Sequence, residues 1–207
     1  IRKAKRFQRL TENILDVTKI DNHSLNLQKE RVNLIDLISR IVQDFRNQID
    51  SPNLLLVCQF EEKQEDKNDL AFVRADKSRL IQVISNLLSN AIKFTKEGII
   101  SVNVEKQVKE KEKGIKQEAI ITVKDMGVGI DPKLLDKLFS KFATKSFAGT
   151  GLGLFISKSI VEAHGGRIWA ENNSDGRGAT FIFTLPLEKS SELIDVINSE
   201  GKNSSSR

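Results

Sequence analysis

The sequence is short of cysteine and of long apolar runs, and each shortage excludes a class of protein. The single Cys58 cannot form an intrachain disulfide, and its setting LLLVCQF is that of a core strand, so we expect a reducing compartment and no thiol chemistry. No run approaches the roughly 18 apolar residues that a membrane-spanning helix needs. No signal-peptide pattern opens the chain, which begins with Ile1 inside an expected helix, so we expect a piece of a longer protein.

A strong charge of one sign is also missing. The 33 Lys and Arg residues against 28 Asp and Glu leave a net charge of +5, and basic residues alternate with acidic ones along the chain. Without a basic stripe, we expect no binding to nucleic acid. A hydrophobic fraction of 39% with 29% charged residues is typical of a soluble globular protein, and 207 residues suit one ordinary domain with a short extra segment, or two small domains.

Hydrophobic periodicity predicts a long first helix over residues 1–22. Phe7, Leu10, Ile14 and Val17 recur three and four residues apart, which is the spacing of a bundle seam. Such a helix is marginal alone, so this seam should pack against a partner.

The rest of the chain predicts an α+β fold, a two-layer sandwich of one sheet against one helix layer. Asn33 and Asp76 are placed to cap two of the helices. A charged loop at 61–70, a hairpin turn at 109–116 and a polar, disordered tail at 189–207 complete the expectation. Strands are expected at 24–34, 53–60, 72–76, 99–108, 117–126, 166–173 and 179–187, and helices at 34–49, 77–95, 131–142 and 151–164.

The stretch SNLLSNAIKFT, at 85–95, places two amides along one side of an apolar helix. Asn86 and Asn90 are four residues apart, and Lys93 follows one turn later. This edge is either the solvated face of the helix or a set of ligands. Amide oxygens suit Mg²⁺, and a lysine supplies a point charge for a phosphate.

Two glycine stretches are the other candidates for chemistry. In KDMGVGI, Asp125 ends a strand and is either a carboxylate in water or a buried acceptor that needs donors such as the amine of adenine. GTGLGLF opens a helix, where backbone amides can cradle a phosphate, although its glycines can equally serve tight turns. Neither stretch fits G-x-G-x-x-G, and no G-x-x-x-x-G-K-[ST] occurs.

Taken in order, NLLSNAIKFT, DMGVGI, LFSKFATK and GTGLGL closely resemble the N, G1, F and G2 boxes of sensor histidine kinases. The resemblance covers roughly 31–187 and implies the Bergerat fold, shared with gyrase-type, chaperone and mismatch-repair ATPases. It divides the chain into 1–24, the second helix of a dimerisation and phosphotransfer hairpin, 25–188, a catalytic ATP-binding domain, and 189–207, a tail.

The resemblance implies a role for each residue at a box position. Asn90 would bind Mg²⁺, Asn86 would contact phosphate or metal-bound water, and Lys93 would meet the phosphates of ATP. Asp125 would select adenine through its amino group, and Thr180 would reach the base through water. The glycine stretches and the lid that covers the nucleotide would supply Gly127, Gly129, Phe139, Phe142, Gly149, Thr150, Gly151, Leu152 and Gly153.

The phospho-accepting histidine of the family is missing from this sequence. His23 and His164 lie in the wrong context and are interpreted as a surface residue and a helix C-cap. The resemblance therefore implies transfer of the γ-phosphoryl group to a histidine outside this sequence, and onward to an aspartate of a response-regulator receiver domain. It also implies a homodimer through the first helix, a cytoplasmic catalytic part, and membrane attachment only through segments outside this sequence.

Three alternatives stay open. A serine kinase of the anti-sigma type shares the ATP site but normally lacks a preceding bundle helix. A degenerate module would bind nucleotide without catalysis, although the boxes are complete. A hydrolytic ATPase is disfavoured, because hydrolytic relatives carry a glutamate where this chain has Asn86, and an amide cannot activate water as a base.

Overall fold

The computed structural model describes residues 2–60, 72–111, 114–143 and 150–188. The expected loop at 61–70 and the expected tail at 189–207 lie outside these residues. Side chains are described from Gln8 onward, except at Arg9 and around the β4–β5 turn.

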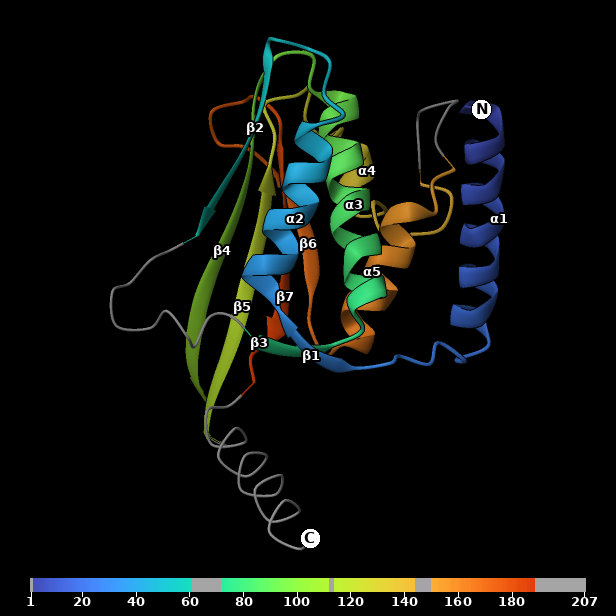
Figure 1. The fold of residues 1–207 in the computed structure, drawn as a ribbon, viewed down its shortest axis with the longest axis vertical. Helices are drawn as coiled ribbons and strands as arrows, with labels where there is room; N and C mark the ends of the chain where they lie inside the picture. The colour runs from blue at the N-terminus through green and yellow to red at the C-terminus, as the bar shows by residue number, and fades with distance from the viewer. Residues whose placement is uncertain (1, 61–71, 112–113, 144–149, 189–207) are drawn as a thin grey trace, which may run out of the picture.

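One mixed sheet of five strands forms the centre of the molecule, and helices α2, α3 and α5 cover one of its faces (Figure 1). Strands β2 and β4 are parallel, and the other neighbours are antiparallel. The α+β sandwich expected from the sequence is confirmed. In sheet order the strands are β2 (Leu54–Phe60), β4 (Gly98–Lys111), β5 (Gly114–Lys124), β7 (Ala179–Pro186) and β6 (Ile168–Asn172). The helices are α2 (Leu34–Arg46), α3 (Lys77–Phe94) and α5 (Gly153–Ala163).

The core lies between the sheet and the helices because alternate strand residues point inward. Ile100, Val102 and Val104 of β4 are each at most 1% exposed, as are Ile84 and Leu87 of α3. Burying such side chains contributes roughly 1.5–3 kcal/mol each. The core therefore fixes α3 against the sheet, and with it the face that carries Asn86 and Asn90.

A second, two-stranded sheet joins β1 (Glu30–Asn33) to β3 (Phe72–Ala75). The strand expected at 24–34 is therefore shorter than predicted, because β3 offers only four residues to pair with. Both predicted caps are confirmed. Asn33 accepts a hydrogen bond from the Asp36 amide at 3.1 Å, and Asp76 accepts one from Arg79 at the same distance.

Three other boundaries differ from the prediction. Helix α4 covers only Pro132–Leu135, instead of 131–142, because the following amides bond three residues back (Lys137 to Leu134, Ser140 to Lys137) in successive turns. Helix α5 begins at Gly153 rather than 151. Strands β4 and β5 pair as far as Lys111 and Gly114, so six of the eight residues expected in the turn at 109–116 belong to the strands.

Helix α1 (Arg2–Asp21) lies beyond α5, on the side of the helix layer away from the sheet (Figure 1). Its Asp16 is 6% exposed and accepts hydrogen bonds from the Arg79 guanidinium at 2.8 Å and the Gln82 amide at 2.7 Å. Asp21, at its end, pairs with Lys141 at 2.6 Å. The helix is thus attached to the domain by polar contacts at two levels.

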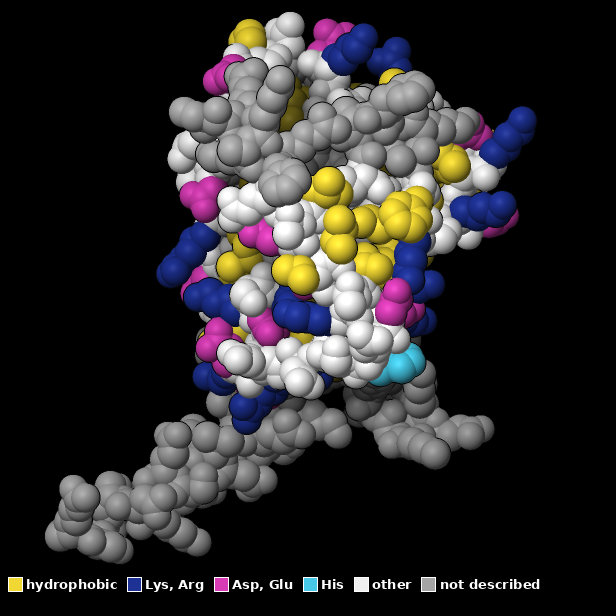
Figure 2. All heavy atoms as spheres, turned by 90° about the vertical axis from the view of Figure 1, so that its right-hand side faces the viewer, with side chains coloured by type: hydrophobic (Ala, Val, Ile, Leu, Met, Phe, Trp, Pro, Cys, Tyr) yellow, Lys and Arg dark blue, Asp and Glu magenta, His cyan; other side chains and the backbone are white. Residues whose placement is uncertain are grey.

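The remaining face of α1 carries exposed apolar side chains (Figure 2). Ile14 and Leu15 are 52% and 56% exposed. Of the seam expected from the sequence, Ile14 is exposed, Leu10 and Val17 are half-buried, and the side chain of Phe7 lies outside the described residues. An apolar face of this kind is typical of a helix that meets a partner.

Replacing Asp16 tests the attachment of α1. In Asp16→Ala, Arg79 keeps its charge in a largely buried position without the carboxylate, so we expect amide exchange in α1 to accelerate about tenfold. Exchange in α3 and in the sheet should stay as in the parent protein. Glu12→Ala, an exposed acid on the same helix, is the matched control. Unchanged exchange in α1 of Asp16→Ala would show that the apolar contacts alone hold the helix.

His164 joins the end of α5 to the start of α3. Its Nε2 accepts a hydrogen bond from the Asp76 amide at 2.9 Å, and its Nδ1 donates one to the Ile160 carbonyl at 2.8 Å, so the ring is neutral. Burial lowers the pKa of His164, and the positive charge of Lys29 acts in the same direction. The Ile160 carbonyl and the Asp76 carboxylate partly oppose this shift. The predicted C-cap role of His164 is confirmed.

This histidine predicts a stability that depends on pH. Because the folded ring resists protonation, the unfolded chain binds the extra proton below about pH 6.5, and the free energy of unfolding should fall as the pH drops from about 7.5 to 5.5. Urea unfolding at several pH values measures this slope. His164→Gln should flatten it, because the variant has no ring to protonate at this position. An identical slope in His164→Gln would assign the pH dependence to other groups.

Candidate functional site

The first part of the site is the contact between α3 and the start of α5. Asn86 is 8% exposed, and its Nδ2 donates to the Ser157 hydroxyl at 3.1 Å. Its Oδ1 occupies the space that Gly153 leaves by having no side chain, since a Cβ built on Gly153 would overlap it. Gly153, in the stretch GTGLGL, is thus in direct contact with Asn86, in the stretch NLLSNAIKFT.

Asn90 and Lys93 continue the same side of α3 toward its C-terminal end. Asn90 is half-buried and Lys93 is exposed, with its Nζ 4.9 Å from the centre of the Phe94 ring. The two amides therefore differ, because Asn86 is buried against α5 whereas Asn90 is only half-buried. Such an edge can offer an amide oxygen and a cation to a ligand lying along α3.

The second part is centred on Asp125, which follows β5 and is 4% exposed. Its Oδ1 accepts hydrogen bonds from the Gly127 amide at 2.8 Å and the Ala179 amide at 3.3 Å, whereas its Oδ2 accepts none from the described residues. Burial raises the pKa of this carboxyl, partly offset by the two amides. Of the two interpretations of the sequence, the buried acceptor is the one that the structure has.

The two parts adjoin each other. A Cβ on Gly127 would lie 2.5 Å from the carbonyl oxygen of Phe94, the last residue of α3. The loop after Asp125 therefore lies against the C-terminal end of the helix that carries Asn90 and Lys93. Together they form one continuous candidate site that runs from Asp125 to the start of α5.

The end of β6 and the turn that follows it support this loop, a role that was not predicted from the sequence. The Asn172 side chain pairs with both backbone groups of Ile130, at 2.7 and 2.8 Å. Asn173 is 9% exposed and bonds Asp125 and Thr180. Two adjacent asparagines before SDGRG look like ordinary turn residues, so nothing in the sequence indicated that they support the candidate site.

The lid residues are only partly brought together. Phe139 packs against the core, whereas Phe142 is 69% exposed and has a positive φ of 63°. Gly151 also has a positive φ, of 66°, and a Cβ there would lie 2.6 Å from the Phe142 carbonyl carbon. The two ends of the lid thus meet at this backbone contact. Among the other residues assigned to the lid, Thr150 is half-buried, Leu152 is 2% exposed, and Gly149 lies outside the described residues.

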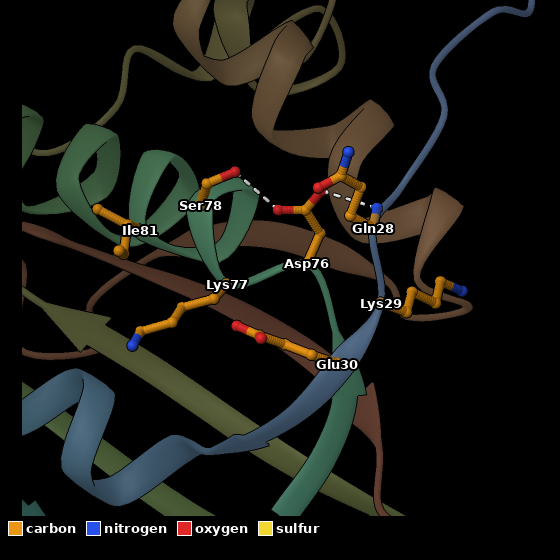
Figure 3. Close-up of a pocket in the computed structure, with 7 residues that line it drawn as sticks. All are labelled: Gln28, Lys29, Glu30, Asp76, Lys77, Ser78 and Ile81. Atoms are coloured by element: carbon orange, nitrogen blue, oxygen red, sulfur yellow. Dashed lines mark hydrogen bonds between the residues drawn. The ribbon is translucent and has the colours of Figure 1, made fainter.

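A separate hollow of about 450 Å³ lies at the opposite end of α3 (Figure 3). There Asp76 lies between Gln28 and Ser78, and both of its carboxylate oxygens accept hydrogen bonds. Those bonds hold the pKa of Asp76 below its usual value although burial opposes them. The hollow thus lies between the chain leaving α1 and the start of α3, the Asp76 carboxylate in it is engaged in helix capping, and it contains none of the predicted site residues.

Comparison with known proteins identifies the class. The model of a family described as "Histidine kinase-, DNA gyrase B-, and HSP90-like ATPase" matches residues 75–189, more than half of the chain. The chain therefore belongs to this ATPase family, and the resemblance drawn from its motifs is confirmed.

Individual relatives narrow the comparison to histidine kinases. The sensor protein kinase WalK of Staphylococcus saprophyticus is 35% identical over 191 residues, which cover 89% of this chain and 29% of WalK, so the chain spans about three tenths of that relative. The structure of histidine kinase ThkA in complex with the response regulator protein TrrA has a TM-score of 0.63 at 30% identity, over 88% of this chain and 49% of that one. Full-length ShkA in complex with AMPPNP shares the fold, with a TM-score of 0.74 at 22% identity, over 91% of this chain and 38% of ShkA.

No helix among the described residues is long and apolar enough to cross a membrane.

Proposed function

We propose that this chain binds Mg-ATP and is the catalytic part of a histidine protein kinase. The observation that carries the proposal is the buried Asp125, whose Oδ1 is held by two backbone amides while Oδ2 is left to accept from a ligand. The exocyclic amine of adenine is a donor that suits it, and a hydrogen bond to a charged group contributes roughly 1.5–3 kcal/mol. The family match supports a nucleotide as the ligand.

The phosphates would lie along the edge that Asn90 and Lys93 form, toward the start of α5. The residues there fit a magnesium ion, because an amide oxygen is a hard neutral ligand and Mg²⁺ usually completes its shell with phosphates and water. Asn90, the more open amide, would hold it, and Asn86 would act beside it. When bound, the metal would offset charge on the phosphates during transfer. Among the described residues, no group of three His, Cys, Asp or Glu side chains is placed to hold a metal.

The acceptor would be a histidine outside this sequence. His164 is buried with both ring nitrogens bonded to backbone groups, and His23 lies in an exposed turn. Asn86 supports transfer over hydrolysis, since an amide is no general base near neutral pH. Helix α1 favours a histidine kinase over a serine kinase of the anti-sigma type, which normally lacks it.

A response-regulator receiver domain would take the phosphoryl group from that histidine. The complex of ThkA with its response regulator supports such a partner. The parent protein would be a homodimer in which the exposed apolar face of α1, with Ile14 and Leu15, joins a helix bundle. The catalytic part would work in the cytoplasm, where ATP is available.

Titration of the chain with ATP, with and without Mg²⁺, tests this function. We expect binding in the micromolar range, about −8 kcal/mol, that weakens when Mg²⁺ is removed. A folded chain that binds no ATP would mean that the four motifs no longer form a nucleotide site. The side of α3 that carries Asn86 and Asn90 would then be a solvated face. Transfer itself would require a hairpin helix that carries the acceptor histidine, so the chain fused to such a helix should label that histidine from γ-³²P-labelled ATP.

A further inference from the structure

We infer that Asn172 is a positioning residue for the proposed nucleotide site, because its side chain holds the far end of the loop at 126–130, whose Gly127 amide orients the Asp125 carboxylate. The inference rests on the proposed function, since it concerns the same carboxylate. It gives the end of β6 a role in ligand affinity, which goes beyond support of the local backbone.

Asn172 belongs to the same row of the sheet as Asp125. In the register of β6 and β7, Asn172 pairs with Ala179, and the Asp125 amide bonds the Ala179 carbonyl at 2.9 Å from the other side. Paired residues of antiparallel strands point to the same face, and Phe181, two positions along β7, lies in the core. The row therefore faces the helix layer. Thr180, the residue between, points to the opposite face and is not part of this row.

The loop at 126–130 is fixed at both ends by side chains rather than by the backbone. At its near end, the Gly127 amide donates to Asp125 Oδ1 at 2.8 Å. At its far end, the Ile130 amide donates to Asn172 Oδ1 at 2.7 Å, and the Ile130 carbonyl accepts from Asn172 Nδ2 at 2.8 Å. Among the residues that the structure describes, the backbone of this loop makes no hydrogen bond with another backbone group.

An asparagine suits the far end because its amide presents one acceptor and one donor side by side. It thus gives Ile130 the two hydrogen bonds that a neighbouring strand would give. The middle of the loop is open to solvent, with Val128 81% exposed. Between the two ends, the Met126 sulfur accepts one weak bond from the Ile99 amide, at 3.4 Å. The pairing with Asn172 is therefore the strongest hold on the far end.

Loss of this pairing would reach Asp125 through Gly127. With Ile130 released, the Gly127 amide would leave Asp125 Oδ1 for part of the time, and the Ala179 amide, at 3.3 Å, would orient the carboxylate alone. A group whose position is less defined has to be ordered by the ligand, and that ordering lowers affinity.

Asn172→Ala tests the inference by amide exchange and by calorimetry with ATP. Because Asn172 is exposed, its truncation leaves no buried void and the variant should fold. Without nucleotide, the amides of Gly127 and Ile130 should exchange about tenfold faster, and the dissociation constant for ATP should rise about fivefold, as expected for one or two lost hydrogen bonds. Glu171→Ala, exposed on the opposite face of β6, is the matched control and should change neither.

A double variant separates positioning from general loosening of the fold. In Asp125→Ala, the Gly127 amide has no carboxylate to orient, so adding Asn172→Ala should cost little further affinity for ATP. Losses that simply add would mean that Asn172 affects the nucleotide by another route, and they would overturn the inference.

The outcomes distinguish the inference from the proposed function. If the parent chain binds no ATP, the proposed function fails, and the inference with it. If the parent chain binds ATP and Asp125→Ala weakens that binding, whereas Asn172→Ala binds as the parent does or leaves both loop amides equally protected, the inference alone is overturned. Faster exchange and weaker binding in Asn172→Ala, without a further loss in the double variant, support it.

Discussion

Asp125→Asn should lower the affinity for ATP by roughly 10- to 100-fold, the cost of losing a hydrogen bond to a charged group. An asparagine oxygen can still accept from Gly127 and Ala179, but its NH₂ then takes the place of Oδ2 and faces the donor amine of adenine. The variant should also bind inosine triphosphate relatively better, because an amide nitrogen can donate to a 6-oxo group. Calorimetric titration with both nucleotides measures each effect.

The same substitution should leave the folded state intact or make it more stable. Burial raises the pKa of Asp125, so its charged form is unfavourable in the folded protein at neutral pH, and a neutral amide avoids that cost. Asp175→Asn, at an exposed position in the neighbouring turn, is the matched control and should bind ATP normally. Unaltered ATP binding in a folded Asp125→Asn protein would remove this carboxylate from the site.

The raised pKa of Asp125 also bears on ligand binding in acid. As the pH falls through that pKa, the carboxyl gains a proton and loses acceptor strength, so ATP affinity should decline at a higher pH than an ordinary aspartate would cause.

Gly153→Ala should reduce Mg-ATP binding at least tenfold by displacing the Asn86 amide. The new methyl group would overlap Asn86 Oδ1, and the backbone of α5 is held by the core through Ile156 and Ile160, so the amide has to move. Alanine is otherwise favourable in a helix, which separates this effect from helix propensity. Calorimetry with and without Mg²⁺ measures the loss.

Two control variants isolate the contact. Ser157→Ala removes the hydrogen-bond partner of Asn86 without crowding it, so we expect a smaller loss of affinity than with Gly153→Ala. Ser159→Ala lies on the same helix and bonds only the Phe155 carbonyl, so it should bind Mg-ATP normally. Equal binding by Gly153→Ala and the parent chain would mean that the position of Asn86 has no influence on the nucleotide.

The sequence predicted the elements well where local rules decide them. Apolar periodicity defined α3, and an aspartate before a helix gave the cap at Asp76. It failed where tertiary contacts decide. The predicted strand at 24–34 forms only over Glu30–Asn33 because β3 is short. The helix that begins at Pro132 ends at Leu135 and is followed by turns. The first of these limits is set by β3 and is therefore not encoded within residues 24–34.

The residues of the candidate site also divide into those that the sequence indicated and those that it did not. Asn86, Asn90, Lys93 and Asp125 lie in motifs, so their residue types and spacing indicated them. Whether Asp125 is buried could not be known, because its cover comes from Ala179, on another strand. The structural roles of Asn172 and Asn173 were not predicted, since asparagines are common in turns. Only the folded sheet shows that they bond the backbone of Ile130 and Asp125.

The pairing of β5 with β7 determines at which stage of folding the surroundings of Asp125 are complete. The amide of Ala179, which donates to Asp125, is 54 residues away along the chain, on β7, which is the last strand in chain order among the described residues. A nascent chain that has not yet placed β7 therefore lacks one of the two amides that hold the Asp125 carboxylate, however well its earlier elements have formed. ATP would bind only the completed fold and would stabilise it by mass action, roughly 2.7 kcal/mol at a concentration a hundred times the dissociation constant. Bound nucleotide would thus stabilise the completed fold after the last step of folding, and it would not stabilise partly folded chains.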